Sequence, residues 1–231
     1  MTIHEALIAH LPTVTFDLYR DIHKGIRAEL FTVTATAGSV DPSDRVDTAA
    51  LADHVRAVAE LLELHAHHED EVIDPSLEAH LPALAERISA DHLVLSVRIG
   101  TLVDMASSAV EAPAPGRRRL VHQLYLDLAS FVSSYLEHQD MEERVVMPAL
   151  EQAIGVEAVI GIHGAILGSI PPDELMRSLA LMLPAMNVDD RTELLGGMRA
   201  AAPPEGFAAV LGLAESVLRP VEFATTAARI A

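Results

Sequence analysis

The sequence contains no cysteine and no tryptophan, and aromatic residues make up only 3% of its 231 residues. Without cysteine, the chain forms no disulfide, binds no metal ion through a thiolate and has no cysteine nucleophile. Any metal ion must therefore be held by imidazole and carboxylate groups, a set that suits iron, manganese or zinc. With so few aromatic side chains, the core must consist mainly of leucine, valine, isoleucine and alanine, a composition that suits helices.

Basic residues are also scarce. The chain has 16 Lys and Arg against 34 Asp and Glu, which gives a net charge of −18. Because this charge repels phosphate backbones, we expect no nucleic-acid partner. The first 17 residues lack a cationic segment followed by an apolar one, so we expect no secretory signal. The longest uncharged run, residues 158–172, is too short to span a bilayer, and we expect a cytoplasmic protein with no membrane partner.

Glycine and proline divide the chain into long helical segments. The pattern predicts helices over residues 13–37, 47–80, 82–111 and 117–154, and no segment alternates as a strand does. Long helices with short connections predict an all-α fold, an up-down-up-down four-helix bundle over residues 1–154. Residues 155–231 are rich in alanine, leucine and methionine and are cut by prolines. They predict a C-terminal helical extension that packs on the bundle or forms an oligomer interface, such as a homodimer contact.

One internal repeat falls on the second and fourth predicted helices. Residues 65–78 match residues 138–151 at a constant offset of 73, with His, Glu, Val, Pro, Leu and Glu in register. Each copy begins with a His-x-x-x-Glu pair. The repeat therefore places one such pair at the equivalent position of two helical hairpins.

Helical geometry decides which histidine of the second helix points inward. Each residue advances about 100°, so positions four apart share a face. His65 and Glu69 fall on the apolar stripe, whereas His67 and Glu71 have the same spacing but fall on the charged side. The buried stripe is predicted to hold Val58, Leu61, Leu62 and Val72, and the opposite face Glu60, Glu63, Asp70 and Asp74. His65 and Glu69 are thus a polar pair within a core face.

The other three helices also aim histidine at the core. On the fourth helix, His138 and Glu142 share the apolar face. His23 on the first helix and His92 on the third lie among apolar residues at helical spacing. The expected neighbours are Phe16, Tyr19, Ile26 and Leu30 for His23, Ile88, Leu95, Ile99 and Val103 for His92, and Phe131, Ser134, Tyr135 and Val145 for His138.

Two buried carboxylates and four buried imidazoles need a compensating charge. Burying an unpaired carboxylate is costly, and no lysine stands opposite this pair; only Arg27 lies near such a face. A single His-x-x-x-Glu pair is usually a surface feature, but two matched pairs and two further inward histidines favour metal coordination. Two carboxylates that bridge two cations suit a di-metal site. We expect the remaining histidines to be solvated, packed or structural: His4, His10, His54, His80, His122 and His163.

These residues resemble the hemerythrin-like family, also called the HHE cation-binding domain. The resemblance covers about residues 23–151 and rests on the His23 context, the two His-x-x-x-Glu pairs that lead to proline, and Asp91 followed by His92. It implies two non-haem iron ions with an oxo or hydroxo bridge, and Glu69 and Glu142 as bridging carboxylates. The ligands that it implies are His23, His65, Glu69, His92, His138 and Glu142.

The sequence departs from the oxygen-carrying hemerythrins at two positions. They have a second histidine on the third helix where this chain has Ser96, and an aspartate five residues after the fourth-helix histidine where this chain has Glu142 at four. A seventh ligand would come from His68, Tyr19 or solvent. The open coordination position predicts a protein that reacts with peroxide, nitric oxide or dioxygen. Two alternatives stay open here: a sensing or regulatory module without turnover, and a structural bundle with zinc.

Overall fold

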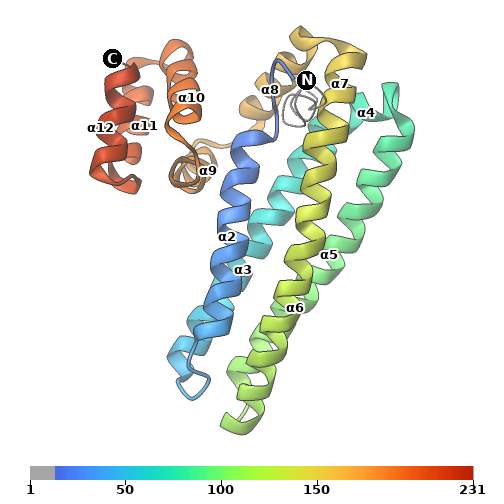
Figure 1. The fold of residues 1–231 in the computed structure, drawn as a ribbon, viewed down its shortest axis with the longest axis vertical. Helices are drawn as coiled ribbons and strands as arrows, with labels where there is room; N and C mark the ends of the chain where they lie inside the picture. Colours follow the sequence, from blue (N-terminus) through green and yellow to red (C-terminus); the bar gives the residue numbers. More distant parts are fainter. Residues whose placement is uncertain (1–13, 231) are drawn as a thin grey trace, which may run out of the picture. The chain divides into compact units, whose positions relative to one another are not determined.

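A computed structural model describes residues 14–230, and each regular element in this range is a helix (Figure 1). No strand occurs among these residues. The all-α prediction is therefore confirmed. The predictions for His4 and His10 lie outside the described residues.

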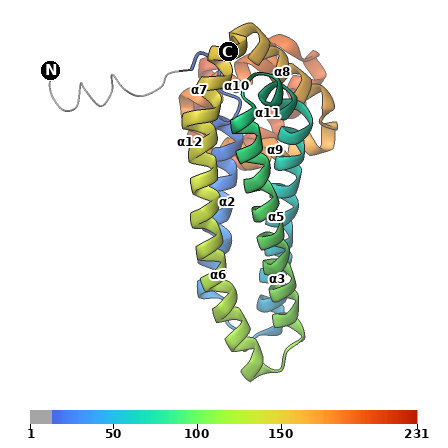
Figure 2. The ribbon, with the colours of Figure 1, turned by 90° about the vertical axis from the view of Figure 1, so that its right-hand side faces the viewer.

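Four long helical columns run side by side, with successive columns antiparallel (Figures 1 and 2). They are α2 (Arg20–Ser39); α3 (Arg45–His68) with the π-helical turn η1 (Glu69–Ile73) and α4 (Asp74–His80); α5 (Pro82–Glu111); and α6 (Ala114–Met141) with the π-helical turn η2 (Glu142–Val146) and α7 (Met147–Ile154). The connections are short. The predicted up-down-up-down bundle is confirmed, and α8 (Val156–Ser169) follows it.

Local signals set the ends of these columns. Asp44 caps α3, since its carboxylate accepts hydrogen bonds from the backbone N–H groups of Val46 and Asp47. Pro82 begins α5, where the missing N–H costs nothing in the first turn. Gly155 ends α7 with a φ of 84°, a backbone conformation that favours glycine.

The first helix begins later than predicted. It starts at Arg20 instead of near Thr13, a residue outside the described range. The segment before it is held in a non-helical form, because the Glu151 carboxylate accepts hydrogen bonds from the backbone N–H groups of Thr15 and Phe16.

Each His-x-x-x-Glu pair ends in a π-helical turn. The apolar pattern of the sequence does not predict these turns. Glu69–Ile73 and Glu142–Val146 are the two turns. In each, the residue after the turn donates its backbone N–H to the carbonyl of the glutamate five positions earlier. Pro75 and Pro148 follow directly. Proline has no N–H and its ring clashes with the carbonyl four residues before it, so a wider turn accommodates it.

The π-helical turns move the buried face by one residue. Val72 and Val145 were predicted to be buried, but Ile73 and Val146 take those places, and Val145 is 46% exposed. The prediction for both valines is wrong because it assumed an uninterrupted α-helical period. For the same reason Asp74, predicted to face solvent, is buried.

The third column, α5, is long and rich in apolar residues. By length and apolar content α5 would suffice to cross a membrane, as would the bent pair of the fourth column and α8 if counted as one segment. In the apolar window of α5, 28% is buried. Ile88, Leu95 and Ile99 of α5 are buried in the bundle core.

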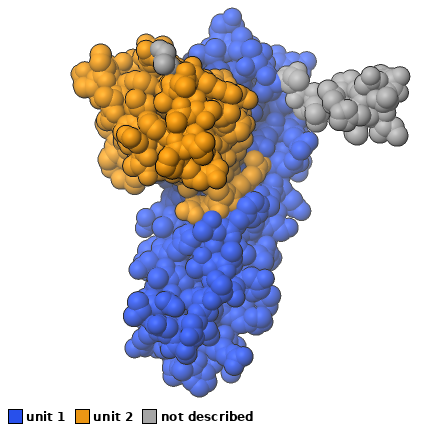
Figure 3. Space-filling model, turned by 60° about the vertical axis from the view of Figure 1, so that its left-hand side comes forward, with its two compact units in different colours: residues 1–19, 30–166 blue, residues 20–29, 167–231 orange. Residues whose placement is uncertain are grey.

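The chain forms two compact units, coloured separately in Figure 3. The first contains the described residues up to Tyr19 and Leu30–Ile166. The second contains Arg20–Glu29 and the chain from Leu167 onward. The domain boundary expected between residues 154 and 155 stays a prediction.

The second unit joins the first turns of α2 to four short helices. These are α9 (Pro172–Ala185), α10 (Val188–Ala201), α11 (Pro204–Val217) and α12 (Pro220–Ile230). Their core contains Leu179, Leu183, Leu195, Val210, Ala214 and Leu218. Lys24 forms an ion pair with Asp190, and Arg20 pairs with Glu193 at 2.9 Å.

Candidate metal centre

The structure brings all six predicted ligand residues together. They are His23, His65, Glu69, His92, His138 and Glu142, and every one of the four columns contributes at least one. All are buried except His92, whose side chain is 10% exposed. Their positions agree with the predicted site, and their role as metal ligands stays a prediction.

The first group consists of His23, His65, Glu69 and Glu142, whose potential ligand atoms all lie within 4.8 Å of one another. The His65 Nε2 atom lies 3.2 Å from a carboxylate oxygen of Glu69, as the one-turn spacing requires. His23 belongs to α2, which is unbroken from Arg20 to Ser39.

The second group consists of Glu69, His92, His138 and Glu142, again with ligand atoms within 4.8 Å. His92 Nε2 lies 3.2 Å from Glu69 Oε2 and 3.8 Å from Glu142 Oε1, and His138 Nε2 lies 3.1 Å from Glu142 Oε1. Both glutamates belong to both groups. The arrangement therefore offers two neighbouring cation positions that share two carboxylates.

The donor atoms fit metal ions chemically. Both carboxylate oxygens of Glu69 and the Nε2 atom of His92 are buried, and none of them makes a hydrogen bond within residues 14–230. A buried carboxylate in this state must be protonated, paired or metal-bound. Imidazole nitrogen with carboxylate oxygen is a set that iron, manganese and zinc accept. The residues therefore fit a centre of two cations.

An aspartate orients one histidine of the second group. The Nδ1 atom of His92 lies 2.8 Å from Asp70 Oδ1, a contact that fixes the ring so that Nε2 faces the centre. Asp91 Oδ2 lies 3.9 Å from the Nδ1 atom of His138, which is too far for a hydrogen bond. The role of Asp70 was missed because that residue was expected to face solvent. The sequence does place each aspartate next to a predicted ligand: Asp70 directly follows Glu69, and Asp91 directly precedes His92.

His92 carries a positive charge in the metal-free centre. Burial lowers its pKa, but contacts with Glu142, Glu69 and Asp70 outweigh burial and raise the pKa to about 11. At neutral pH the ring is therefore protonated. It balances part of the charge of the two glutamates, a task that bound cations would take over.

Two buried tyrosines stand beside the centre. Burial, reinforced by the charges of Glu142 and Glu69, raises the pKa of Tyr19 and of Tyr135 well above 10. Both phenols are protonated at neutral pH and can donate a hydrogen bond. The ring of Tyr135 lies 5.7 Å from that of His138.

The choice between the two His-x-x-x-Glu pairs of the second column is confirmed by burial. His67 and Glu71 are exposed, whereas His65 and Glu69 are buried. His68, considered as a seventh ligand, is half-buried and belongs to neither group of potential ligands found in residues 14–230.

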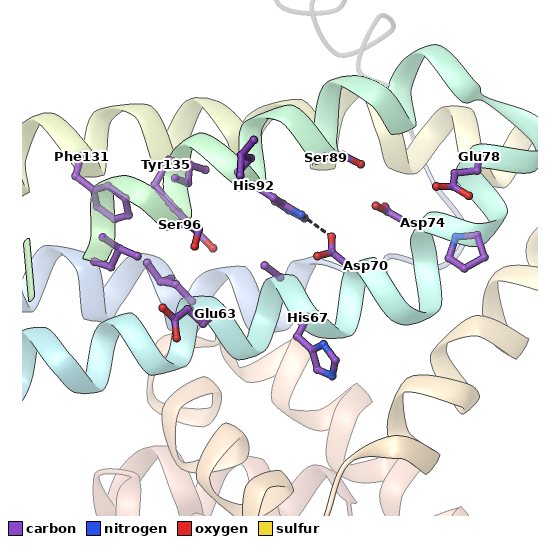
Figure 4. Close-up of a pocket in the computed structure, with 16 residues that line it drawn as sticks. Glu63, His67, Asp70, Asp74, Glu78, Ser89, His92, Ser96, Phe131 and Tyr135 are labelled. Atoms are coloured by element: carbon purple, nitrogen blue, oxygen red, sulfur yellow. Dashed lines mark hydrogen bonds and ion pairs between the residues drawn. The ribbon is translucent and has the colours of Figure 1, made fainter. Parts of the chain in front are cut away.

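A pocket of about 600 Å³ reaches the centre from one side (Figure 4). Its wall includes His92, Tyr135 and Ser96, the last at the position where the oxygen carriers have histidine. Ser96 is exposed, so the pocket opens to solvent at that point. The apolar part of the wall comes from Leu62, Leu95, Ile99 and Phe131.

We expect Asp74→Asn to stabilise the metal-free protein at neutral pH. Burial, then the charges of Asp70, Glu69 and Glu78, raise the pKa of Asp74 to about 6, and His92 opposes them. Above pH 6 the charged carboxylate costs the folded state about 3 kcal/mol. The favourable interaction of this carboxylate with the start of α4 offsets less than about 1 kcal/mol of that cost.

The net expected gain is about 2 kcal/mol at pH 7, and it should vanish below about pH 3, where the carboxyl group is protonated in both the folded and the unfolded state. Thermal or urea unfolding of both proteins across this pH range measures it. An equal gain in the free energy of unfolding at about pH 3 and at about pH 7 would contradict the electrostatic cause.

An antiparallel helical bundle with a buried cluster of histidine and glutamate is suited to binding metal cations. The profile of the hemerythrin HHE cation binding domain matches residues 14–150, more than half of the chain. The chain belongs to this family.

The comparison with curated proteins gives one distant relative, the zinc finger protein BRUTUS of Arabidopsis thaliana. It is 25% identical over 183 residues, which cover 79% of this chain but only 14% of that protein. No solved structure matches.

Proposed function

We propose that this protein is a non-haem di-iron protein that reacts with a small ligand, either peroxide, nitric oxide or dioxygen. The observation that carries the proposal is the pocket, which runs from solvent to His92 along the face where Ser96 replaces a histidine. When bound, iron supplies redox chemistry and a coordination position that the six protein ligands leave open.

The residues around the pocket have separable tasks. Leu95, Ile99 and Phe131 form an apolar wall that limits water beside the centre. Tyr135 stands in this wall and keeps its phenolic proton at neutral pH, so it can donate a hydrogen bond to a ligand. Asp70 holds the His92 ring in the orientation that the centre requires.

Metal analysis and optical spectroscopy of the full chain test this proposal. We expect two irons per chain and near-ultraviolet absorption that changes when peroxide, nitric oxide or oxygen is added. Less than one metal ion per chain with no such absorption contradicts it. Zinc in the place of iron, without redox chemistry, would favour the structural alternative.

A sensing module without turnover is the second candidate function. The second compact unit contains the first turns of α2, and these turns carry His23. A change of metal state at His23 would then act on a helix that the C-terminal helices also hold through Lys24 and Asp190. Partners captured equally with and without iron would count against this function.

A further inference from the structure

Metal ions must reach a centre whose ligands are almost entirely enclosed. The side chains of His65, Glu69, His138 and Glu142 are between 1% and 8% exposed, and His23 is fully buried. His92 is the most accessible of the six, and it lines the pocket. The pocket therefore gives cations access to one of the six residues.

One end of this pocket is acidic. Figure 4 shows Asp70, Asp74 and Glu78 at one end and His92 in the middle. Phe131 and Tyr135 lie at the other end, where Glu63 is the one labelled carboxylate. Asp70 and Glu78 are exposed, so this end meets solvent. Carboxylates gathered at one end of a cleft concentrate cations there. A cation that enters from solvent at this end therefore meets the carboxylates first, then His92 and then the centre.

Asp74 is the residue that points to a ligand. It is only 7% exposed, its Oδ1 atom is buried, and this atom makes no hydrogen bond within residues 14–230. The charges of Asp70, Glu69 and Glu78 all act unfavourably on it. A buried carboxylate without a hydrogen-bond donor and among like charges is costly, and a cation removes both penalties.

The surroundings favour a metal ion over an organic cation. The acidic end offers three carboxylates, whereas Phe131 and Tyr135 lie at the far end of the pocket. Asp74 belongs to neither group of residues in the described chain that could hold an ion. These features suit brief contact with a passing ion and not a permanent third site.

We propose that the acidic end of the pocket is the loading route by which divalent metal ions reach the centre, with Asp74 as a transient ligand. This inference rests on the metal-binding function proposed above. It assigns to Asp74 and Glu78 a kinetic role, in contrast to the six residues that would hold the metal at equilibrium.

Metal uptake by the apo form of the full chain tests the route. Cobalt(II) is a suitable probe because its visible absorption reports ligation without oxygen chemistry, and ferrous iron added anaerobically is the second probe. We expect Asp74→Asn to slow uptake about tenfold and Glu78→Gln to slow it less, with the final stoichiometry and spectrum unchanged. Uptake by the wild type should also slow as salt screens the carboxylates.

Glu86→Gln is the matched control, because Glu86 is an exposed carboxylate of α5 outside the pocket. Its uptake rate should equal that of the wild type. Since Asp74→Asn is expected to stabilise the apo protein, thermal unfolding of each variant separates slow loading from misfolding.

Four outcomes overturn the route. One is an equal rate in the Asp74→Asn and Glu86→Gln variants. Another is a lower final stoichiometry in Asp74→Asn, which would make Asp74 a ligand of the centre itself. The third is binding of an alkylammonium ion that needs Asp74 but leaves metal uptake unchanged. A wild type that takes up no metal at all defeats the proposed function as well, so the two failures are distinguishable.

Discussion

Glu142→Ala is expected to leave the chain without bound metal, and His65→Ala to leave it with at most one ion. Glu142 belongs to both groups of potential ligands, so its loss opens both cation positions. His65 belongs to one group only. Loss of a direct ligand should exceed the roughly 10–100-fold loss of affinity seen when an outer-shell partner is removed. Metal content and near-ultraviolet absorption measure both effects.

His67→Ala is the control for this experiment. It removes an imidazole from the same helix, two residues from His65, but that imidazole is exposed and belongs to neither group. Metal content should remain that of the wild type. If His67→Ala loses metal as His65→Ala does, the assignment of the inward pair is wrong.

Helical periodicity predicts the inward direction of both His-x-x-x-Glu pairs because each π-helical turn begins only at the glutamate. His65 and Glu69 lie one turn apart, and the helix is a regular α-helix up to His68. The same holds for His138 and Glu142, since α6 runs to Met141. The inward direction of each pair was therefore readable from the apolar stripe.

Beyond each glutamate the prediction fails for a physical reason. A π-helical turn adds one residue to the turn, so a face extrapolated with a period of 3.6 is one position out. This moved Val72 and Val145 off the core face and Asp74 onto it. The signal was present in Pro75 and Pro148, each six residues after a glutamate, but it predicts a local distortion without giving its form.

Other features depend on packing that no periodicity describes. The contact between Asp70 and His92 joins two columns, so predicting it requires the position of one column along the other. Predicting the pocket requires the spacing between α3, α4 and α5. Arg20–Glu29 belongs to the second unit, and predicting this requires knowledge of the ion pairs that Arg20 and Lys24 form with α10.

Removal of the metal is expected to lower the stability of the wild type substantially. Binding to the folded state alone contributes about 4 kcal/mol when the free ion is a thousandfold above its dissociation constant. For a chain of this length, each kcal/mol changes the melting temperature by roughly 2–4 °C. Chelation should therefore lower the melting temperature by roughly 8–16 °C, as measured by calorimetry or circular dichroism before and after dialysis against a chelator.

The Glu142→Ala variant should show no change on chelation, because it holds no ion to lose. A melting temperature of the wild type that is the same with and without chelator would contradict a metal ion bound at the core. A fall that is equal in the wild type and the variant would indicate an effect of the chelator elsewhere on the chain.

Chelation and Asp74→Asn should also act on each other. In the metal-free protein, Asp74 is surrounded by the charges of Asp70, Glu69 and Glu78, and the asparagine relieves this repulsion. Bound cations neutralise Glu69, so the charged form of Asp74 costs less and the gain from asparagine shrinks. Chelation should therefore lower the stability of the Asp74→Asn variant less than it lowers the stability of the wild type. The difference between these two losses, measured at pH 7, reports how strongly the pocket and the centre are electrostatically coupled.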